Sequence, residues 1–204
     1  MARSKSFDEE AVLDQAAQLF WERGYEGTSL ADLETHLGLG RQSLYNSFGD
    51  KHSLFLKVLD RYRRDMGGAA LAHLDAPDAG LDEIRGFFRW SVESLTSSPD
   101  ARRGCLLINT ISDRGSQDPD AMLRCNHARD QLERALRRAL VQAKTRREVP
   151  KGLDVEATAT LLVVQHYGLT VLAKAGAPAT QLNASVDALF AGLKDRHAAA
   201  GRSR

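Results

Sequence analysis

Apolar residues recur three and four positions apart along most of this chain, and no long stretch alternates between apolar and polar residues. Leu13, Ala16, Ala17 and Phe20, for example, share one face of a helix that turns by about 100° per residue. Only 5 of the 204 residues are proline, so few positions interrupt such helices. The pattern therefore predicts an all-α protein.

The first third of the chain has clear helix boundaries. Gly24 is expected to end the first helix, and Thr28 or Ser29 to cap a short second helix with Leu30, Leu33 and Leu37 on its apolar face. The glycines at 38 and 40 predict a tight break before a third helix at about 41–47. A fourth helix is expected after Asp50. Two helices separated by a short break predict a helix-turn-helix at about 28–47.

Glycine and proline residues that can interrupt helices recur after this segment. Gly67, Gly68 and the stretch 76–80 predict that a small helix-turn-helix domain, residues 6–66, ends there and that a larger helical domain, residues 67–204, follows. Further helices are expected at about 81–95, 104–114, 119–144, 154–173 and 181–196.

Charge and cysteine content define the class of protein only broadly. The net charge is +1, and residues 1–64 carry nine Lys and Arg against ten Asp and Glu, so charge alone does not predict nucleic-acid binding. Two cysteines are too few for a disulfide framework, and the first ten residues lack an apolar signal segment. The most apolar stretch, 157–175, is interrupted by Gln165 and His166. We therefore expect a cytoplasmic protein without a membrane span.

The predicted third helix has two different faces. Leu44 and Phe48 lie together on one side and can pack onto the second and first helices. The opposite side is polar, as the major groove of DNA requires of a recognition helix. The alternative is that this polar face is merely solvated, as in many short exposed helices.

Each polar residue of this face has a chemically suitable partner in DNA. Arg41 can pair with guanine or phosphate, Gln42 and Asn46 can offer a donor and an acceptor to adenine, and Tyr45 can reach a phosphate or a thymine methyl group. Phosphate contacts are expected from helix starts, namely from Thr28 and Ser29 on the second helix and from Lys51 on the fourth.

Several runs fall in the register of a known family. They are AQLFWERGYEG at 17–27, TSLADL at 28–33, HLGLGRQSLYNSF at 36–48 and DKHSLF at 50–55. Over about residues 7–60 the chain resembles the DNA-binding domain of the TetR family of bacterial transcriptional regulators. The resemblance implies that Thr28 and Lys51 touch phosphates and that the groove is faced by Arg41, Gln42, Ser43, Tyr45 and Asn46. Arg41, Gln42 and Asn46 depart from the common family pattern, so they are expected to determine the operator preference.

The resemblance also implies a homodimer, in most members a repressor, that binds a palindromic operator and is released by a small-molecule inducer. The residue pattern agrees, because Leu182, Val186, Leu189, Phe190 and Leu193 form an apolar stripe and 157–175 is apolar nearly all round. We expect the last two helices to form a four-helix dimer interface. The alternative is that both helices are core of a monomer.

An inducer pocket is expected among the helices between residues 81 and 167. The predicted lining residues include Phe88, Cys105, Asn109, His166 and Tyr167. Large apolar residues in such a stretch more often belong to the core than to a pocket wall. No metal-ligand spacing is present and no cofactor is predicted, so the sequence does not name the ligand.

Cys105 offers a second way to sense a signal. It is expected at the start of a helix just after Arg102 and Arg103, and both a helix N-terminus and nearby cations lower the pKa of a thiol. The alternative function is a repressor that senses oxidants or electrophiles through this thiol, as in one subgroup of the family. The other interpretation is a buried, inert cysteine.

No Gly-x-Ser-x-Gly, His-Glu-x-x-His or Cys-x-x-Cys motif occurs, so an enzyme is not predicted. A helical protein-interaction module is the alternative from another class. The sequence as a whole predicts a DNA-binding regulator in which a ligand changes the separation of two recognition helices, with coupling through the fourth helix.

Overall fold

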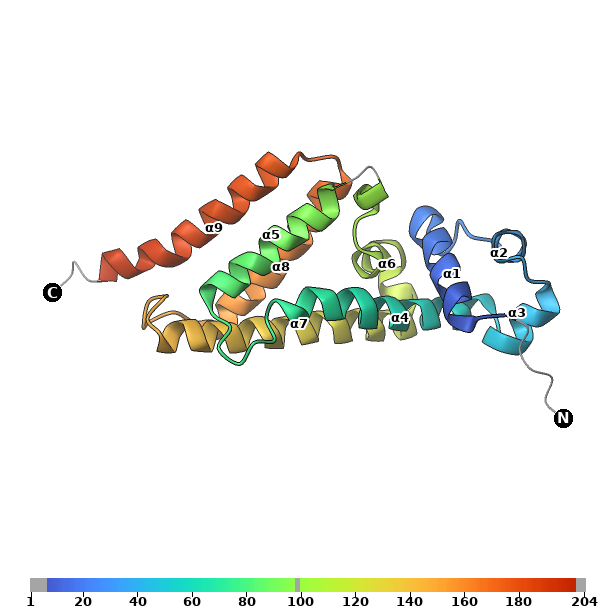
Figure 1. The fold of residues 1–204 in the computed structure, drawn as a ribbon, viewed down its shortest axis with the longest axis horizontal. Coiled ribbons are helices and arrows are strands. Elements are labelled where there is room, and N and C mark those ends of the chain that lie inside the picture. Colours follow the sequence, from blue (N-terminus) through green and yellow to red (C-terminus); the bar gives the residue numbers. More distant parts are fainter. Residues whose placement is uncertain (1–6, 98–99, 201–204) are drawn as a thin grey trace. The chain divides into compact units, whose positions relative to one another are not determined.

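A computed structural model describes residues 7–97 and 100–200, without the side chains of residues 100, 102, 116 and 195–200 (Figure 1). Within these ranges the chain forms nine α-helices and two short 3-10 helices and no strand, which confirms the predicted all-α class. Their bounds are α1 (Glu9–Arg23), α2 (Leu30–Leu37), α3 (Arg41–Phe48), α4 (Lys51–Ala72), α5 (Leu81–Thr96), η1 (Asp100–Arg103), α6 (Leu106–Arg114), η2 (Gly115–Gln117), α7 (Pro119–Thr145), α8 (Val155–Lys174) and α9 (Ala179–Ala200).

The contacts divide the chain into two compact units. The first unit consists of Met1–Asp65 together with Leu106–Asn126, and the second of Met66–Cys105 together with His127–Arg204. Thus α6 and the beginning of α7 pack with the N-terminal helices, whereas the sequence placed them in the second domain. The division into a domain of residues 6–66 and a domain of residues 67–204 stays a prediction.

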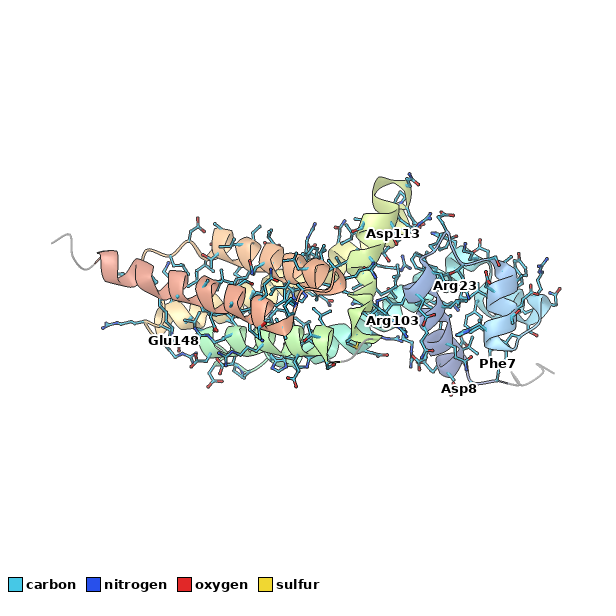
Figure 2. All side chains as sticks on the ribbon, turned by 90° about the horizontal axis from the view of Figure 1, so that it is seen from above. Phe7, Asp8, Arg23, Arg103, Asp113 and Glu148 are labelled. Atoms are coloured by element: carbon cyan, nitrogen blue, oxygen red, sulfur yellow. The ribbon has the colours of Figure 1, made fainter. Side chains whose placement is uncertain are left out.

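The first unit is built on α1. Asp8, labelled in Figure 2, caps this helix by accepting the backbone N–H of Glu10 at 3.0 Å, and Gly24 ends it with φ +69°. The buried face of α1 includes Phe20, whose ring lies edge-on to that of Phe55 on α4 with centroids 5.0 Å apart. These contacts hold α1 and α4 together as the frame of the unit.

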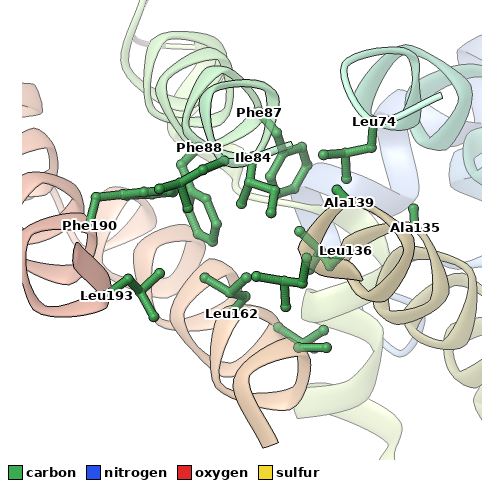
Figure 3. Close-up of a cluster of buried hydrophobic side chains, with 14 of the residues drawn as sticks. Leu74, Ile84, Phe87, Phe88, Ala135, Leu136, Ala139, Leu162, Phe190 and Leu193 are labelled. Carbon is green, nitrogen blue, oxygen red and sulfur yellow. The ribbon is translucent and has the colours of Figure 1, made fainter. Parts of the chain in front are cut away.

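The core of the second unit brings together apolar faces of α5, α7, α8 and α9 (Figure 3). Phe87, Phe88 and Phe190 are completely buried in it. The whole α9 stripe predicted from the sequence faces inward, since Leu182, Val186, Phe190 and Leu193 are buried and Leu189 is partly buried. This stripe is therefore core of the chain itself.

The fourth helix runs through the glycine pair at 67 and 68. It continues through Gly67 and Gly68 to Ala72, although glycine inside a helix costs about 1 kcal/mol relative to alanine. Ala70 and Leu71 pack against the core of the second unit, and this burial stabilises the last turn. The two glycines therefore do not end α4.

By length and average hydropathy, α8 would be long and apolar enough to cross a membrane. Of its most apolar window, 39% is buried inside the chain, and helices of protein cores pass the same test. Its buried side packs against α5 and α9. The expected cytoplasmic location and lack of membrane contact remain predictions.

Candidate DNA-binding surface

Two short helices and a glycine turn form the predicted helix-turn-helix. Gly38 ends α2 in the left-handed conformation, with φ +63° and ψ 24°, and this conformation is costly for residues with a Cβ atom. Leu33 and Leu37 of α2 are buried, as are Leu44 and Phe48 of α3. The buried leucines fix α3 against α2, so the opposite side of α3 is presented to solvent.

That side carries every residue predicted to face the groove. All five are exposed, namely Arg41, Gln42, Ser43, Tyr45 and Asn46. Tyr45 is the aromatic residue among them, and 42% of its surface is accessible to solvent. The sequence therefore placed these five residues on one surface, and their contact with DNA stays a prediction.

The exposed polar side chains of α3 are themselves ordered by hydrogen bonds. Arg41 Nε donates to Glu34 Oε1 of α2 at 2.7 Å, and this bond raises the pKa of Arg41. Gln42 Nε2 donates to Asn46 Oδ1 at 2.9 Å. Pre-ordered side chains lose less conformational entropy when they bind a partner.

Thr28 has a structural role that the sequence did not indicate. Its side chain is completely buried, and its hydroxyl donates to the carbonyl oxygen of Gly24 at 2.7 Å. The hydroxyl is thus engaged in the turn between α1 and α2. A phosphate contact at Thr28 remains a prediction, and it would have to use the backbone.

The start of α2 is closed by a capping box. Ser29 Oγ accepts the N–H of Asp32 at 3.1 Å, and Asp32 Oδ2 accepts the N–H of Ser29 at 2.9 Å. The hydroxyl of Ser29, at 2.6 Å, and its N–H both donate to the Asp32 carboxylate and lower its pKa, and the same carboxylate pairs with Arg23 at 2.8 Å. Ser29 is exposed, so a phosphate could reach it, and this contact stays a prediction.

Replacing Thr28 by valine keeps the shape of the buried side chain and removes its hydroxyl. The Gly24 carbonyl then loses its side-chain donor, and we expect the free energy of unfolding to fall by about 1–2 kcal/mol. Urea unfolding measures this change. Thr35→Val is the matched control, because the exposed Thr35 makes the same kind of bond to Ala31 and water can replace it. Equal losses in the two variants would contradict the role assigned to burial.

Lys51 begins α4, and its ammonium group lies 4.1 Å from the ring centroid of Tyr25. Burial lowers the pKa of Lys51, and the same Tyr25 ring lies 4.2 Å from Cζ of Arg114. A phosphate contact of Lys51 stays a prediction. The stacking on Tyr25 orders its long side chain.

A charge cluster around Asp118 lies in the same unit and was not predicted. Asp118 is buried and accepts Arg114 Nε at 2.8 Å and the N–H of Ala121 at 3.0 Å, while His52 Nε2 lies 3.1 Å from each carboxylate oxygen. Burial alone would raise the pKa of Asp118, but these hydrogen bonds outweigh it and lower the pKa. Arg114 also pairs with Glu26. The i,i+4 spacing of Arg114 and Asp118 is visible in the sequence, whereas the pairing with Glu26 and His52 is not.

Three of the predicted ligand residues come together in the second unit. The His166 ring lies 5.0 Å from that of Phe87, 6.4 Å from Phe88 and 6.3 Å from Tyr167. Its Nδ1 is buried and makes no hydrogen bond within the described part of the chain, and burial lowers its pKa to about 4. The histidine is therefore neutral at pH 7.

The other two predicted ligand residues are placed differently. Cys105 is half-buried and directly precedes α6, and Asn109 is a half-buried residue of α6 in the first unit. Arg103, labelled in Figure 2, ends η1, and the Arg102 side chain lies outside the described residues. Ligand contacts of all five residues stay predictions. Across the described residues, no three His, Cys, Asp or Glu side chains gather as metal ligands.

Protonation of His166 should reduce stability on mild acidification. The unfolded chain takes up the proton near the ordinary pKa of 6.5 and the folded chain at about 4, so protons favour the unfolded state in this window. We expect the free energy of unfolding to fall by about 3 kcal/mol between pH 6.5 and 4, at about 1.4 kcal/mol per unit. Denaturant unfolding across this range tests it. His166→Phe should remove this part of the decline, whereas exposed His127→Gln should keep it; a parallel decline in the phenylalanine variant would contradict the assignment.

Comparison with known proteins identifies the family. Residues 12–58 match the bacterial regulatory proteins of the tetR family, and residues 80–189 match the tetracyclin repressor-like C-terminal domain. The uncharacterized HTH-type transcriptional regulator YezE of Bacillus subtilis is 36% identical over 188 residues, which are 92% of this chain and 96% of YezE. The chain belongs to the TetR family. This confirms the resemblance predicted from the sequence, and the protein is a DNA-binding transcriptional regulator.

Two further regulators match over nearly the full length. The transcriptional repressor ComR of Escherichia coli is 35% identical, and the match covers 88% of this chain and 86% of ComR. A cysteine mutant of the TetR-family regulator CifR, solved in complex with 26-base-pair operator DNA, is 28% identical with a TM-score of 0.82. That match covers 92% of this chain and 98% of CifR. These relatives are named as transcriptional regulators, and membership of the TetR family disfavours the protein-interaction module.

Proposed function

We propose that this chain is a homodimeric repressor that binds a palindromic operator and is released by a small-molecule inducer. The observation that carries the proposal is the exposed polar face of α3, with Arg41, Gln42 and Asn46 opposite the buried Leu44 and Phe48. A face of this kind suits the major groove, where guanidinium and amide groups distinguish base edges. The operator complex of CifR and the repressor name of ComR support the same activity.

The dimer is proposed to form through α8 and α9. The outward face of α8 carries Leu161, Val164, Val171 and Leu172, each between 47% and 62% exposed. They recur at helical spacing along one side, whereas monomeric proteins seldom expose contiguous apolar patches of this kind. Small residues on the exposed side of α9, Ala184, Ala188 and Ala191, would allow a second copy to approach closely. A self-complementary interface around a two-fold axis would bury the apolar face of α8 and the small-residue face of α9 together.

Two-fold symmetry would then determine the form of the operator. Two copies of α3 would enter successive major grooves about 34 Å apart, and each would read one half of a palindrome. The first-turn N–H groups of α2, together with Ser29 and Lys51, would hold the phosphates that flank each half-site.

The inducer is proposed to bind near the ring cluster of Phe88, His166 and Tyr167. The buried Nδ1 of His166 lies in an aromatic environment and has no hydrogen bond to any described residue, and a ligand could supply its partner. Because His166 is neutral, we expect an uncharged, largely apolar ligand with one hydrogen-bonding group. Ligand binding would favour a dimer with a different separation of its recognition helices, and α4, which has residues in both units, would couple the two states.

Selection from a random double-stranded DNA pool with the full-length protein tests the proposal. A palindrome with half-sites one helical turn apart should be enriched, and its binding should weaken as the salt concentration rises. Equal binding to all sequences would overturn it. The thiol-sensing alternative stays a prediction, and Cys105→Ser tests it through release of the selected operator by oxidants.

A further inference from the structure

Arg41 carries the only charge on α3, and it is bound to an acid of the preceding helix. Its Nε donates to Oε1 of Glu34 at 2.7 Å. The Glu34 side chain, on α2, is 28% exposed, whereas 62% of the Arg41 side chain is exposed. The less exposed carboxylate of α2 thus anchors the long arginine side chain that begins α3.

The hydrogen bond leaves the outer end of the Arg41 guanidinium group for DNA. This group is a planar fork with five N–H donors, of which Glu34 accepts the one on Nε. The donors on Nη1 and Nη2 remain, and two of them point in parallel from the outer edge. Because the bond at Nε restrains the torsion angles of the side chain, the fork is oriented before it meets DNA.

Two parallel donors fit guanine best among the four bases. Guanine presents two neighbouring acceptors, O6 and N7, in the major groove. Adenine places an amino group beside its N7, cytosine presents a donor, and thymine presents one acceptor beside a methyl group. A guanidinium group cannot accept a hydrogen bond, so it gains least from the amino groups of adenine and cytosine.

Charge separates guanine from phosphate, the other partner expected for Arg41. Arg41 and Glu34 together carry no net charge. The carboxylate stays within about one Debye length, ~8 Å, of any group that the fork contacts, so it repels a phosphate there. The acceptors of guanine are uncharged and avoid this repulsion. The pair therefore favours a base edge over the DNA backbone.

We propose that Arg41 reads one guanine in each operator half-site and that Glu34 is the positioning residue that directs it to this base. The proposal rests on the proposed function, in which α3 enters the major groove. It chooses between the two partners expected for Arg41 from the sequence. It also gives a residue of α2, which the sequence did not single out, a role in base recognition.

The proposal predicts a coupled loss of guanine discrimination. We define this discrimination as the factor by which the dissociation constant rises when the guanine of one half-site of the selected operator is replaced by adenine. Arg41→Ala should lower it by about 10-fold or more. Glu34→Ala should lower it at the same position by about threefold or more, and should add nothing in the Arg41→Ala background, because Glu34 acts through Arg41. Fluorescence anisotropy with the full-length protein at one salt concentration measures each constant.

Glu34→Gln separates positioning from charge. The glutamine keeps an oxygen acceptor for Nε of Arg41 but removes the carboxylate, so it should retain more of the guanine discrimination than Glu34→Ala. Both variants should bind random-sequence DNA more tightly than the wild type, because Arg41 is then free to attract phosphates. Thermal unfolding should change little, since an exposed ion pair contributes little to stability. A purely structural role of Glu34 would instead weaken binding to all DNA.

The double variant Glu34→Ala, Arg41→Ala tests the partner of Arg41, because it keeps the net charge of the protein. Its operator affinity should depend on salt concentration as steeply as that of the wild type. If Arg41 instead contacts a phosphate, the slope of log affinity against log salt concentration should be shallower by about 0.9 per half-site. That result would overturn the guanine assignment.

The outcomes separate this proposal from the proposed function. If the wild-type protein selects no sequence, the proposed function fails. If it selects a palindrome but Glu34→Ala leaves guanine discrimination unchanged, only the positioning role of Glu34 fails. A half-site in which Arg41→Ala alters no guanine position would overturn the guanine reading while the palindromic operator stands.

Discussion

Replacing Val164 by glutamate is expected to leave the chain folded but monomeric and to weaken operator binding by about 100-fold or more. Val164 is 62% exposed within the chain, so the substitution does not disturb the core. In the proposed dimer the new carboxylate would be buried against an apolar face and, near the two-fold axis, close to its own copy. Loss of the second half-site contact removes the gain from bivalent binding. Sedimentation measures the oligomeric state, and anisotropy measures the affinity.

Val141→Glu is the matched control for this prediction. Val141 is 46% exposed on α7 in the same unit, so the same chemical change is made outside the apolar face of α8. This variant should remain dimeric and bind the operator normally. A dimeric Val164→Glu protein with normal affinity would show that the face of α8 is not the interface.

The sequence predicted the helix-turn-helix well because its signals are local. Gly24 and Gly38 end helices in conformations with positive φ, Ser29 caps α2, and the Leu44 and Phe48 spacing identifies the buried side of α3. Each of these signals acts over a few residues. Family membership and the all-α fold followed from the same local features.

Features that depend on tertiary contacts were predicted less well. The glycines at 67 and 68 favour a helix end, but burial of Leu71 outweighs their cost and α4 continues. The apolar stripe of α9 suggested an interface, yet periodicity cannot tell a core face from an interface face. The structure assigns this stripe to the core and leaves the apolar face of α8 exposed within the described chain.

Residues of the site itself show the same division. The sequence identified Gln42 and Asn46 as exposed polar groups, but the bond between them depends on side-chain rotamers that periodicity does not contain. It assigned Thr28 to phosphate binding by its place at a helix start, and the structure shows its hydroxyl bound to Gly24. The Asp118 cluster joins residues separated by 66 and 88 positions, for which a single sequence gives no signal.

This cluster gives the first unit a physical link between α6–α7 and the DNA-binding helices. Arg114 at the end of α6 binds Asp118, pairs with Glu26 in the turn before α2, and lies on the ring of Tyr25. The ammonium group of Lys51, which is predicted to bind a phosphate, lies over the same Tyr25 ring. A displacement of α6 would therefore act directly on Lys51, a side chain predicted to contact DNA, and on the segment that leads into α2.

Removing the Asp118 carboxylate should cost more stability than any other single change considered so far. Asp118→Ala leaves Nε of Arg114 and the N–H of Ala121 without their acceptor, and the Arg114 side chain is only 13% exposed. Breaking a buried ion pair by removing one partner costs about 3–5 kcal/mol. We expect a loss of this size in the free energy of unfolding by urea at pH 7.

Two further variants separate charge from capping. Asp118→Asn keeps an acceptor for Ala121 and should lose less stability than Asp118→Ala, whereas Asp120→Ala, an exposed acid in the first turn of α7, should lose no more than about 1 kcal/mol. The pH dependence of stability gives a second, independent test of the Asp118 charge. Because the pKa of Asp118 is lowered in the folded chain, its contribution is complete above the ordinary value of 3.8 and declines as the pH falls below it. The asparagine variant should lack this part of the acid-induced decline; an unchanged decline would mean that the Asp118 charge does not stabilise the link between α6, α7 and the DNA-binding helices.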